Sequence, residues 1–183
     1  MQASVFVGTS LDGFLARLDH SFDFLPADGG EPHGYREFMA TVDALVIGRK
    51  TYEVVLGMEP WPYGDKSVIV LSSSELKPAP PQAKVQRMSG EPHKIWAELE
   101  AKGYRHIYVD GGITVQRFLA ARLIHRIVIT RVPVVIGSGI PLFGSVPHDI
   151  RLRHVATRSF RDGMVQSEYH TDRTREEDIR PLW

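Results

Sequence analysis

Short runs of apolar residues alternate along the chain with segments in which apolar residues recur three or four positions apart. A continuous apolar run with no polar alternation is typical of a strand that is covered on both faces. Such runs predict strands at residues 3–9, 44–47, 68–71, 106–109 and 127–130. The helical spacing between them predicts helices at residues 34–42, 50–57 and 92–102, and one more that begins near residue 114.

The last third of the chain has a different pattern. Residues 152–160 and 164–169 alternate between apolar and polar side chains around Arg161-Asp162-Gly163, which predicts a β-hairpin. Buried strands separated by helices predict a mostly parallel sheet covered on both faces, with the hairpin adding antiparallel strands at one edge. We therefore expect an α/β fold, a single three-layer domain at residues 1–172, followed by a charged tail at residues 173–183.

Composition narrows the class of protein. The 183 residues suffice for one domain with a proper core. The 22 basic and 22 acidic residues give no net charge, which argues against nucleic-acid binding, because nucleic-acid-binding proteins usually carry a basic excess. The chain has no cysteine, so disulfides, thiolate metal sites and a cysteine nucleophile are excluded.

The sequence contains no evident targeting segment, membrane segment or metal motif. It begins directly with a strand-like run, and its longest apolar stretch, residues 132–136, is too short to cross a bilayer. The eight histidines include no pair at helical spacing with an acidic partner, so we expect no metal site. These features favour a cytoplasmic protein that makes no membrane contact.

Three strand ends carry residues that suit a phosphate group. Gly48, Arg49 and Thr51 follow one buried strand, the serine run 72–74 follows the next, and the sequence 110–114, Asp-Gly-Gly-Ile-Thr, follows a third. Glycine lets a ligand approach the main chain, and a helix start presents N–H groups to an anion. Because ligands of parallel sheets bind at the carboxyl ends of strands, the three corners predict a nucleotide that lies across one sheet edge.

Each corner also has a purely structural interpretation. Gly48 and Arg49 could form a helix-start turn, serines are frequent in turns, and Gly111-Gly112 could be a tight connection that is followed by a helix capped by Thr114. The glycine-rich string 137–144 has the wrong spacing for a dinucleotide fingerprint and contains a proline, so it predicts a loop at the site mouth or at a dimer edge.

The chain resembles the dihydrofolate reductase fold, and more closely the reductase domain of bifunctional riboflavin-biosynthesis enzymes and its stand-alone relatives. The resemblance covers residues 3–171 in order. Its motifs are Ser-Leu-Asp-Gly at 10–13, Asp-Ala-Leu-Val-Ile-Gly-Arg-Lys-Thr-Tyr-Glu at 43–53, the serines 72–74, Val-Asp-Gly-Gly at 109–112, and Val-Ile-Gly-Ser-Gly-Ile-Pro-Leu-Phe at 135–143.

The resemblance implies an eight-stranded sheet, NADPH as hydride donor and a homodimer. It implies that Gly48, Arg49 and Thr51 meet the pyrophosphate and the adenosine-side phosphate, and that Ser72 and Ser73 meet the adenine ribose or its 2′-phosphate.

The same resemblance assigns the pyrophosphate to the main chain and helix start of Gly111, Gly112, Ile113, Thr114 and Val115. It also implies a cis peptide bond between Gly111 and Gly112. Related folate enzymes often have a basic residue where Ile113 stands, so NADH is not excluded as the cofactor.

On the substrate side, Gly8 and Leu15 would border the nicotinamide, and Asp12, in the loop after the first strand, is the candidate proton source or a turn residue beside Gly13. Asp28 resembles the acidic substrate anchor of folate reductases.

Glycines and a proline interrupt the helix that should follow Asp28, so Glu31 or Glu37 are alternatives to it. The expected activity is hydride transfer to a carbonyl or imine carbon of a pyrimidine- or pteridine-like heterocycle, or of a ribosylamino-pyrimidine such as 5-amino-6-(5-phosphoribosylamino)uracil. The alternatives are a non-catalytic nucleotide-binding or sensor module and a true dihydrofolate reductase.

Overall fold

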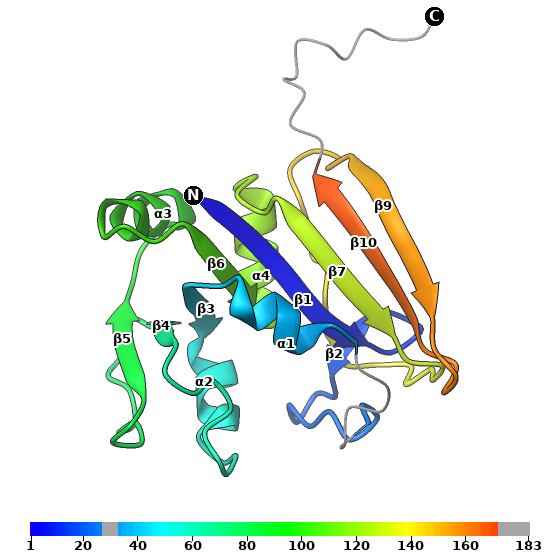
Figure 1. Cartoon of the computed structure of the whole chain (residues 1–183), viewed down its shortest axis with the longest axis horizontal. Helices are drawn as coiled ribbons and strands as arrows, with labels where there is room; N and C mark the ends of the chain where they lie inside the picture. Colours follow the sequence, from blue (N-terminus) through cyan, green and yellow to red (C-terminus); the bar gives the residue numbers. More distant parts are fainter. Residues whose placement is uncertain (27–32, 172–183) are drawn as a thin grey trace, which may run out of the picture.

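The computed structural model describes residues 1–26 and 33–171 and has helices on both faces of one large sheet (Figure 1). The sheet has eight strands in the order β5-β4-β3-β6-β1-β7-β10-β9. Their bounds are β1 Gln2–Thr9, β3 Ala44–Gly48, β4 Ser67–Leu71, β5 Lys84–Met88, β6 His106–Asp110, β7 Arg126–Arg131, β9 Leu152–Ser159 and β10 Val165–Thr171. The predicted tail at residues 173–183 lies outside the described residues.

The strands from β5 to β7 are parallel, and the last hairpin is antiparallel to them. Strand β1 lies between β6 and β7 and is parallel to both, with Val5 opposite Ile127. Strand β10 pairs antiparallel with β7 and with β9. The predicted fold class, a mostly parallel sheet with a C-terminal antiparallel hairpin, is confirmed.

Four helices cover the sheet in the described part of the chain. They are α1 Tyr35–Ala40, α2 Arg49–Val55, α3 Pro92–Ala101 and α4 Gly112–Ala120. Helix α3 starts with a proline, whose missing N–H costs nothing at a first helical position. The prediction that Thr114 caps α4 is wrong, because the helix starts at Gly112 and Thr114 is buried inside its first turn. None of the described helices combines the length and apolarity that crossing a bilayer requires.

The strands bury apolar side chains on both faces. On one face, Val46, Ile107 and Ile127 pack against α3 and α4, where Phe118 is fully buried. On the other face, Leu45 belongs to a second cluster that includes residues of α1 and α2. Burying one such side chain stabilises the fold by about 1.5–3 kcal/mol. Because both faces of these strands are buried, successive residues along each strand are apolar.

Three short or edge strands were not predicted from the sequence. Strands β2 (Phe14–Ala16) and β8 (Ile140–Pro141) pair with each other in a separate small sheet. Residues 10–33 were expected to be mostly loop, and two or three residues are too few to show a period of two. Edge strand β5 is mostly polar and exposed, so it lacks the apolar run that marked its neighbours.

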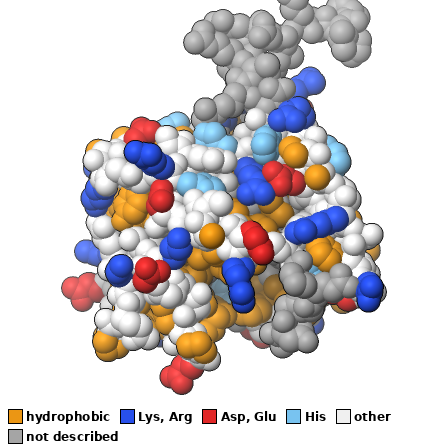
Figure 2. Space-filling model, viewed as in Figure 1, with side chains coloured by type: hydrophobic (Ala, Val, Ile, Leu, Met, Phe, Trp, Pro, Cys, Tyr) orange, Lys and Arg blue, Asp and Glu red, His pale blue; other side chains and the backbone are white. Residues whose placement is uncertain are grey.

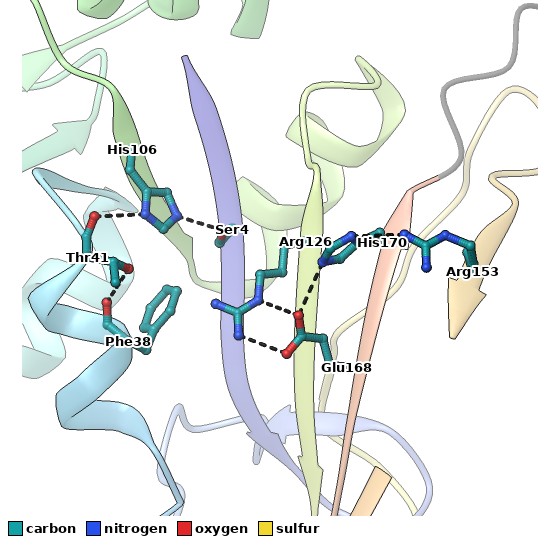
Figure 3. A network of polar contacts seen from close by, with 8 residues as sticks. All are labelled: Ser4, Phe38, Thr41, His106, Arg126, Arg153, Glu168 and His170. Carbon is teal, nitrogen blue, oxygen red and sulfur yellow. Dashed lines mark hydrogen bonds and ion pairs between the residues drawn. The ribbon is translucent and has the colours of Figure 1, made fainter. Parts of the chain in front are cut away.

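A network of polar side chains crosses the sheet near its antiparallel edge (Figure 3). The Arg126 guanidinium of β7 donates to both carboxylate oxygens of Glu168 on β10, at 2.8 Å each. His170 lies 3.2 Å from Glu168, and Arg153 of β9 lies 3.4 Å from His170. These contacts pair charged side chains on β7, β10 and β9, of which the edge strand β9 is exposed along its whole length.

Replacing Leu45 by alanine is expected to lower the free energy of unfolding by about 2–5 kcal/mol, because a fully buried side chain leaves a cavity. Urea unfolding measures the change. The control is Val155→Ala on exposed β9, which is expected to shift stability by no more than about 0.5 kcal/mol. A similar loss in both variants would contradict the two-layer core described above.

Candidate active site

A cleft of about 720 Å³ opens at the carboxyl ends of β3, β6 and β1. Gly48 of β3, Asp110 of β6 and Gly8 of β1 form its floor, and the starts of α2 and α4 form one side. The other side comes from residues 15–25, α1 and the connection between α2 and β4. This is the edge at which parallel sheets bind ligands.

Two glycines bring the helix starts together at this edge. A Cβ atom at Gly48 would lie 3.0 Å from Thr114 Oγ1 of α4, and a Cβ at Gly111 would overlap Thr51 Oγ1 of α2. The start of α4 therefore packs over the end of β3, and the start of α2 packs over the end of β6. Gly111 also has φ 90°, a conformation that residues with a side chain rarely adopt.

The bond between Gly111 and Gly112 is not cis. Among the described residues the cis peptide bond is that between Glu59 and Pro60, so the predicted cis bond at the glycine pair is wrong. The chain reverses there because Gly111 adopts φ 90° and ψ 137°, which turns the main chain from β6 directly into α4.

Cationic side chains line the helix side of the cleft. Arg49 and Lys50 stand in the first turn of α2, and both pair with Glu53, at 2.9 and 3.6 Å. Arg117 of α4 donates to the Gly90 carbonyl at 2.9 Å. The Arg49 and Lys50 side chains are 44% and 61% exposed, so both can reach an anionic ligand.

The small β2–β8 sheet lies against the start of α4. A Cβ at Gly112 would lie 2.8 Å from Ile140 Cγ2 and 3.2 Å from the Pro141 carbonyl oxygen. Gln116 Nε2 of α4 donates to the same carbonyl at 2.9 Å. Leu15 of β2 completes this wall, which brings residues of the first loop to the cleft.

Asp110 is a cleft residue that the sequence analysis did not single out. It follows the buried strand β6, and its Oδ1 accepts a hydrogen bond of 2.7 Å from the Gly111 N–H. Burial raises the pKa of Asp110 above its usual value, and the bond from Gly111 opposes that shift only in part. The signal available in the sequence was an acidic residue placed between a buried strand and two glycines.

Phenol groups surround the Asp110 carboxyl. Tyr35, Tyr63 and Tyr108 also line the cleft, and the Tyr108 hydroxyl donates to the Phe6 carbonyl at 2.7 Å. Burial, with a smaller contribution from the Asp110 charge, raises the pKa of all three phenols, so they stay neutral. Figure 2 views the molecule as in Figure 1 and shows hydrophobic side chains gathered on the surface below the position of α1.

The structure brings most of the predicted cofactor residues to one cleft. The predicted residues that line it are Gly8, Leu15, Gly48, Arg49, Thr51, Gly111, Gly112, Ile113 and Thr114. Ser72 and Ser73 do not line it, and the Ser72 hydroxyl donates to the Ser74 carbonyl at 2.8 Å. Val115 is fully buried in the core, and its N–H donates to Gly111 within the helix.

The predicted acidic residues lie apart from the cleft or outside the described residues. Asp12 does not line the cleft and accepts hydrogen bonds from the Ile136 and Gly137 N–H groups, at 3.3 and 2.8 Å. A hydrogen bond to Ser10 and those two N–H groups lower the pKa of Asp12, so it stays ionised and joins two loops. Asp28 and Glu31 fall within residues 27–32, which are not described.

Glu37 lines a second cavity of about 580 Å³ between α1 and strands β7, β10 and β9. The charged pair Arg126–Glu168 lies in its wall, with both side chains already satisfied by each other. The start of α1 lines this cavity, but the residues that the parallel strands β1 and β7 contribute to it lie away from their carboxyl ends. The first cleft, which opens at strand carboxyl ends, is therefore the candidate active site. Across residues 1–26 and 33–171, no three histidine or acidic side chains are grouped as metal ligands would be.

Replacing Gly111 by alanine is expected to destabilise the fold more than the same change at Gly103. Both glycines have φ near 90°, which costs a residue with a Cβ about 1–2 kcal/mol, but Gly103 has nothing within 4 Å of the added atom. The overlap with Thr51 adds about 1–3 kcal/mol at Gly111. Urea unfolding of both variants measures the difference. Equal losses of unfolding free energy would show that the Thr51 side chain moves away from the added Cβ without cost.

Comparison with known proteins agrees with this geometry. The profile of the RibD C-terminal domain matches residues 4–166. The uncharacterised protein YwjB of Bacillus subtilis (strain 168) is 36% identical over 160 residues, 85% of this chain and 90% of YwjB. A crystal structure from Shewanella sp. PV-4, described as that of a riboflavin biosynthesis protein, is 37% identical, has a TM-score of 0.85, and matches over 94% of this chain and 100% of that one.

A more distant structure shares the fold. Dihydrofolate reductase from Enterococcus faecalis, complexed with NADP(H), is 18% identical, with a TM-score of 0.65 over 93% of this chain and 96% of that one. The match to the family profile spans most of the chain and includes the strand ends that form the cleft. The chain belongs to the RibD C-terminal domain family and has a dihydrofolate-reductase-like fold.

Proposed function

We propose that the protein is an NADPH-dependent reductase that transfers a hydride to a carbonyl or imine carbon of a pyrimidine- or pteridine-like heterocycle. Membership of the RibD C-terminal domain family supports reductase chemistry of the riboflavin-pathway type. The observation that carries the proposal is the cleft itself. It combines two helix starts packed closely over glycines, cations, and a carboxyl whose pKa is raised by burial, all at one sheet edge.

The helix side of the cleft fits the phosphates of a dinucleotide. Gly48 and Gly111 allow the starts of α4 and α2 to pack closely over the strand ends, because a Cβ at either glycine would meet Thr114 or Thr51. The first turn of α4 directs N–H groups without intrahelical partners toward an anion, and Arg49 and Lys50 add positive charge. The relative from E. faecalis that shares this fold is complexed with NADP(H). Bound NADPH supplies the hydride.

The substrate must also gain a proton at the oxygen or nitrogen next to the reduced carbon. Asp110 suits this role because it lines the cleft and its raised pKa keeps a proton on the carboxyl above the pH at which a solvated aspartate loses it. The Gly111 N–H holds the carboxyl in place from the side of the main chain. Asp110 therefore acts as the general acid, in place of Asp12.

We further propose that the exposed Arg49 guanidinium meets the 2′-phosphate, which NADPH carries and NADH lacks. Replacing Arg49 by glutamine is then expected to weaken NADPH binding about tenfold or more and to leave NADH binding within about threefold. Titration of nicotinamide fluorescence measures both affinities, and loss of reduced-nicotinamide absorbance with candidate heterocycles measures turnover.

The control for Arg49 is Arg151→Gln, an exposed residue outside the cleft, which is expected to change neither affinity. Equal losses for the two coenzymes would remove Arg49 from the 2′-phosphate site. If wild-type protein binds neither coenzyme, the proposed function is wrong. Binding without turnover on any heterocycle would favour a non-catalytic nucleotide-binding module.

Replacing Asp110 by asparagine is expected to lower kcat by about 10²-fold or more with NADPH affinity unchanged, because the amide cannot give up a proton. In the wild type, kcat is expected to fall as pH rises through the raised pKa of Asp110, because only the protonated acid is active. Steady-state rates against pH measure both effects, and the exposed Asp149→Asn is the control.

The same pKa shift links stability to pH. The folded state binds the Asp110 proton more tightly than the unfolded state, so this contribution to stability is fully present below the unfolded value, near 3.8, and is lost as pH rises through the folded pKa. Asp110→Asn is expected to remove that part of the pH dependence of unfolding.

The catalytic role of Asp110 has a separate test. A pH profile of kcat that is unchanged in the variant would exclude Asp110 as the acid.

A further inference from the structure

Building on the proposed function, we infer that the substrate half of the cleft takes an uncharged aromatic heterocycle without a phosphate group. The half in question lies between residues 18–25, α1 and residues 58–63, opposite the starts of α2 and α4. This narrows the proposed substrates, because it excludes the phosphoribosyl compound among them.

The walls of this half are apolar and aromatic. Leu18, Phe22 and Leu25 reach it from the first long connection, and Tyr35 and Tyr63 face it from α1 and from the connection after α2. Leu18 and Phe22 are 71% and 38% exposed, respectively, although both are large hydrophobic residues. Large apolar side chains that remain accessible around a cavity are typical of a surface that a ligand covers.

The charges of the cleft are separated. Its arginine and lysine side chains, Arg49, Lys50 and Arg117, all come from α2 and α4, where the coenzyme phosphates are proposed to bind. Among the described residues that line the substrate half, the basic group is the imidazole of His20, and no lysine or arginine is present. The undescribed residues 27–32 contain no lysine or arginine either.

The phenols in the substrate half are neutral hydrogen-bonding groups. Burial raises the pKa of Tyr35 and Tyr63, so both stay protonated, and burial also raises the pKa of the Asp110 carboxyl at its end of the cleft. Neutral donors and acceptors match the amide and amino edge of a pyrimidine or pteridine ring, and the aromatic walls match its faces. Flat, uncharged ring systems are therefore favoured by both the shape and the chemistry of the walls.

A phosphate in this half would be strongly disfavoured. Taking a doubly charged group out of water is costly unless cations and hydrogen bonds replace the water. The described residues that line this half include no lysine or arginine to pair with the phosphate, and an ionised Asp110 would repel it. A substrate phosphate would also compete with the coenzyme for Arg49 and Lys50, which already share Glu53.

The test compares two matched compounds, 5-amino-6-(5-phosphoribosylamino)uracil and the same compound after removal of its phosphate by a phosphatase. Calorimetry with NADP⁺-loaded protein measures binding of each, and NADPH oxidation measures kcat/KM. We expect the dephosphorylated compound to bind at least about tenfold more tightly, a difference of about 1.4 kcal/mol. A preference for the phosphorylated compound, or binding of neither, would overturn the inference.

Leu18→Arg supplies the missing cation on an exposed wall position. The variant is expected to improve binding of the phosphorylated compound about tenfold relative to the dephosphorylated one, because an arginine can pair with the phosphate. The control, Val155→Arg on exposed β9, adds the same charge outside the cleft and is expected to leave the ratio unchanged. An unchanged ratio in Leu18→Arg would contradict the placement of the substrate.

The failures of the two proposals are distinguishable. Coenzyme titration without any heterocycle tests the reductase proposal, because protein that binds neither NADPH nor NADH cannot carry out the reaction. If NADPH binds and the phosphorylated compound is preferred, the reductase proposal stands and only the substrate class is wrong.

Discussion

The cleft depends on two glycines that stand under two threonines. Gly48 ends β3 beneath Thr114, and Gly111 directly follows β6 beneath Thr51, so the helix after each strand packs over the end of the other strand. Because neither glycine has a Cβ, the two helix starts lie close together. Neighbouring parallel strands place their ends side by side, and this reciprocal packing joins the two strand–helix corners into one wall of the cleft.

The order of the strands also explains why the two ends of the cleft differ in chemistry. The helices that start at β3 and β6 supply cations and N–H groups, whereas the long connections before α1 and after α2 supply apolar and aromatic side chains. Asp110 lies where these regions meet, at the end of a central strand. Its position explains both its burial and its place in the lining of the cleft, whereas Asp12, on an outer loop, does not line the cleft.

The fold was largely predictable because its central strands are buried on both faces and therefore carry continuous apolar runs. The two strand–helix corners of the cleft were identifiable because each carries a glycine after a buried apolar run. Gly111 is favoured by its φ of 90°, and Gly48 by its close contact with Thr114. Asp110 was missed because its raised pKa comes from burial in the folded cleft, which it lines together with Tyr35 and Tyr63, two residues distant from it in sequence. Strands β2 and β8 were missed because their pairing is a tertiary contact between segments more than a hundred residues apart, with no periodicity of its own.

The small β2–β8 sheet has a consequence for how this protein can evolve. Gly112, Ile140 and Leu15 occupy one tight contact at the start of α4, and the backbone of residue 112 tolerates no larger group while isoleucine stands at 140. Mutational drift at any of the three positions is therefore constrained by the other two. In homologues, a larger residue at 112 should accompany a smaller one at 140 or 15, so these sites should change together and preserve the packing of the small sheet against the start of α4.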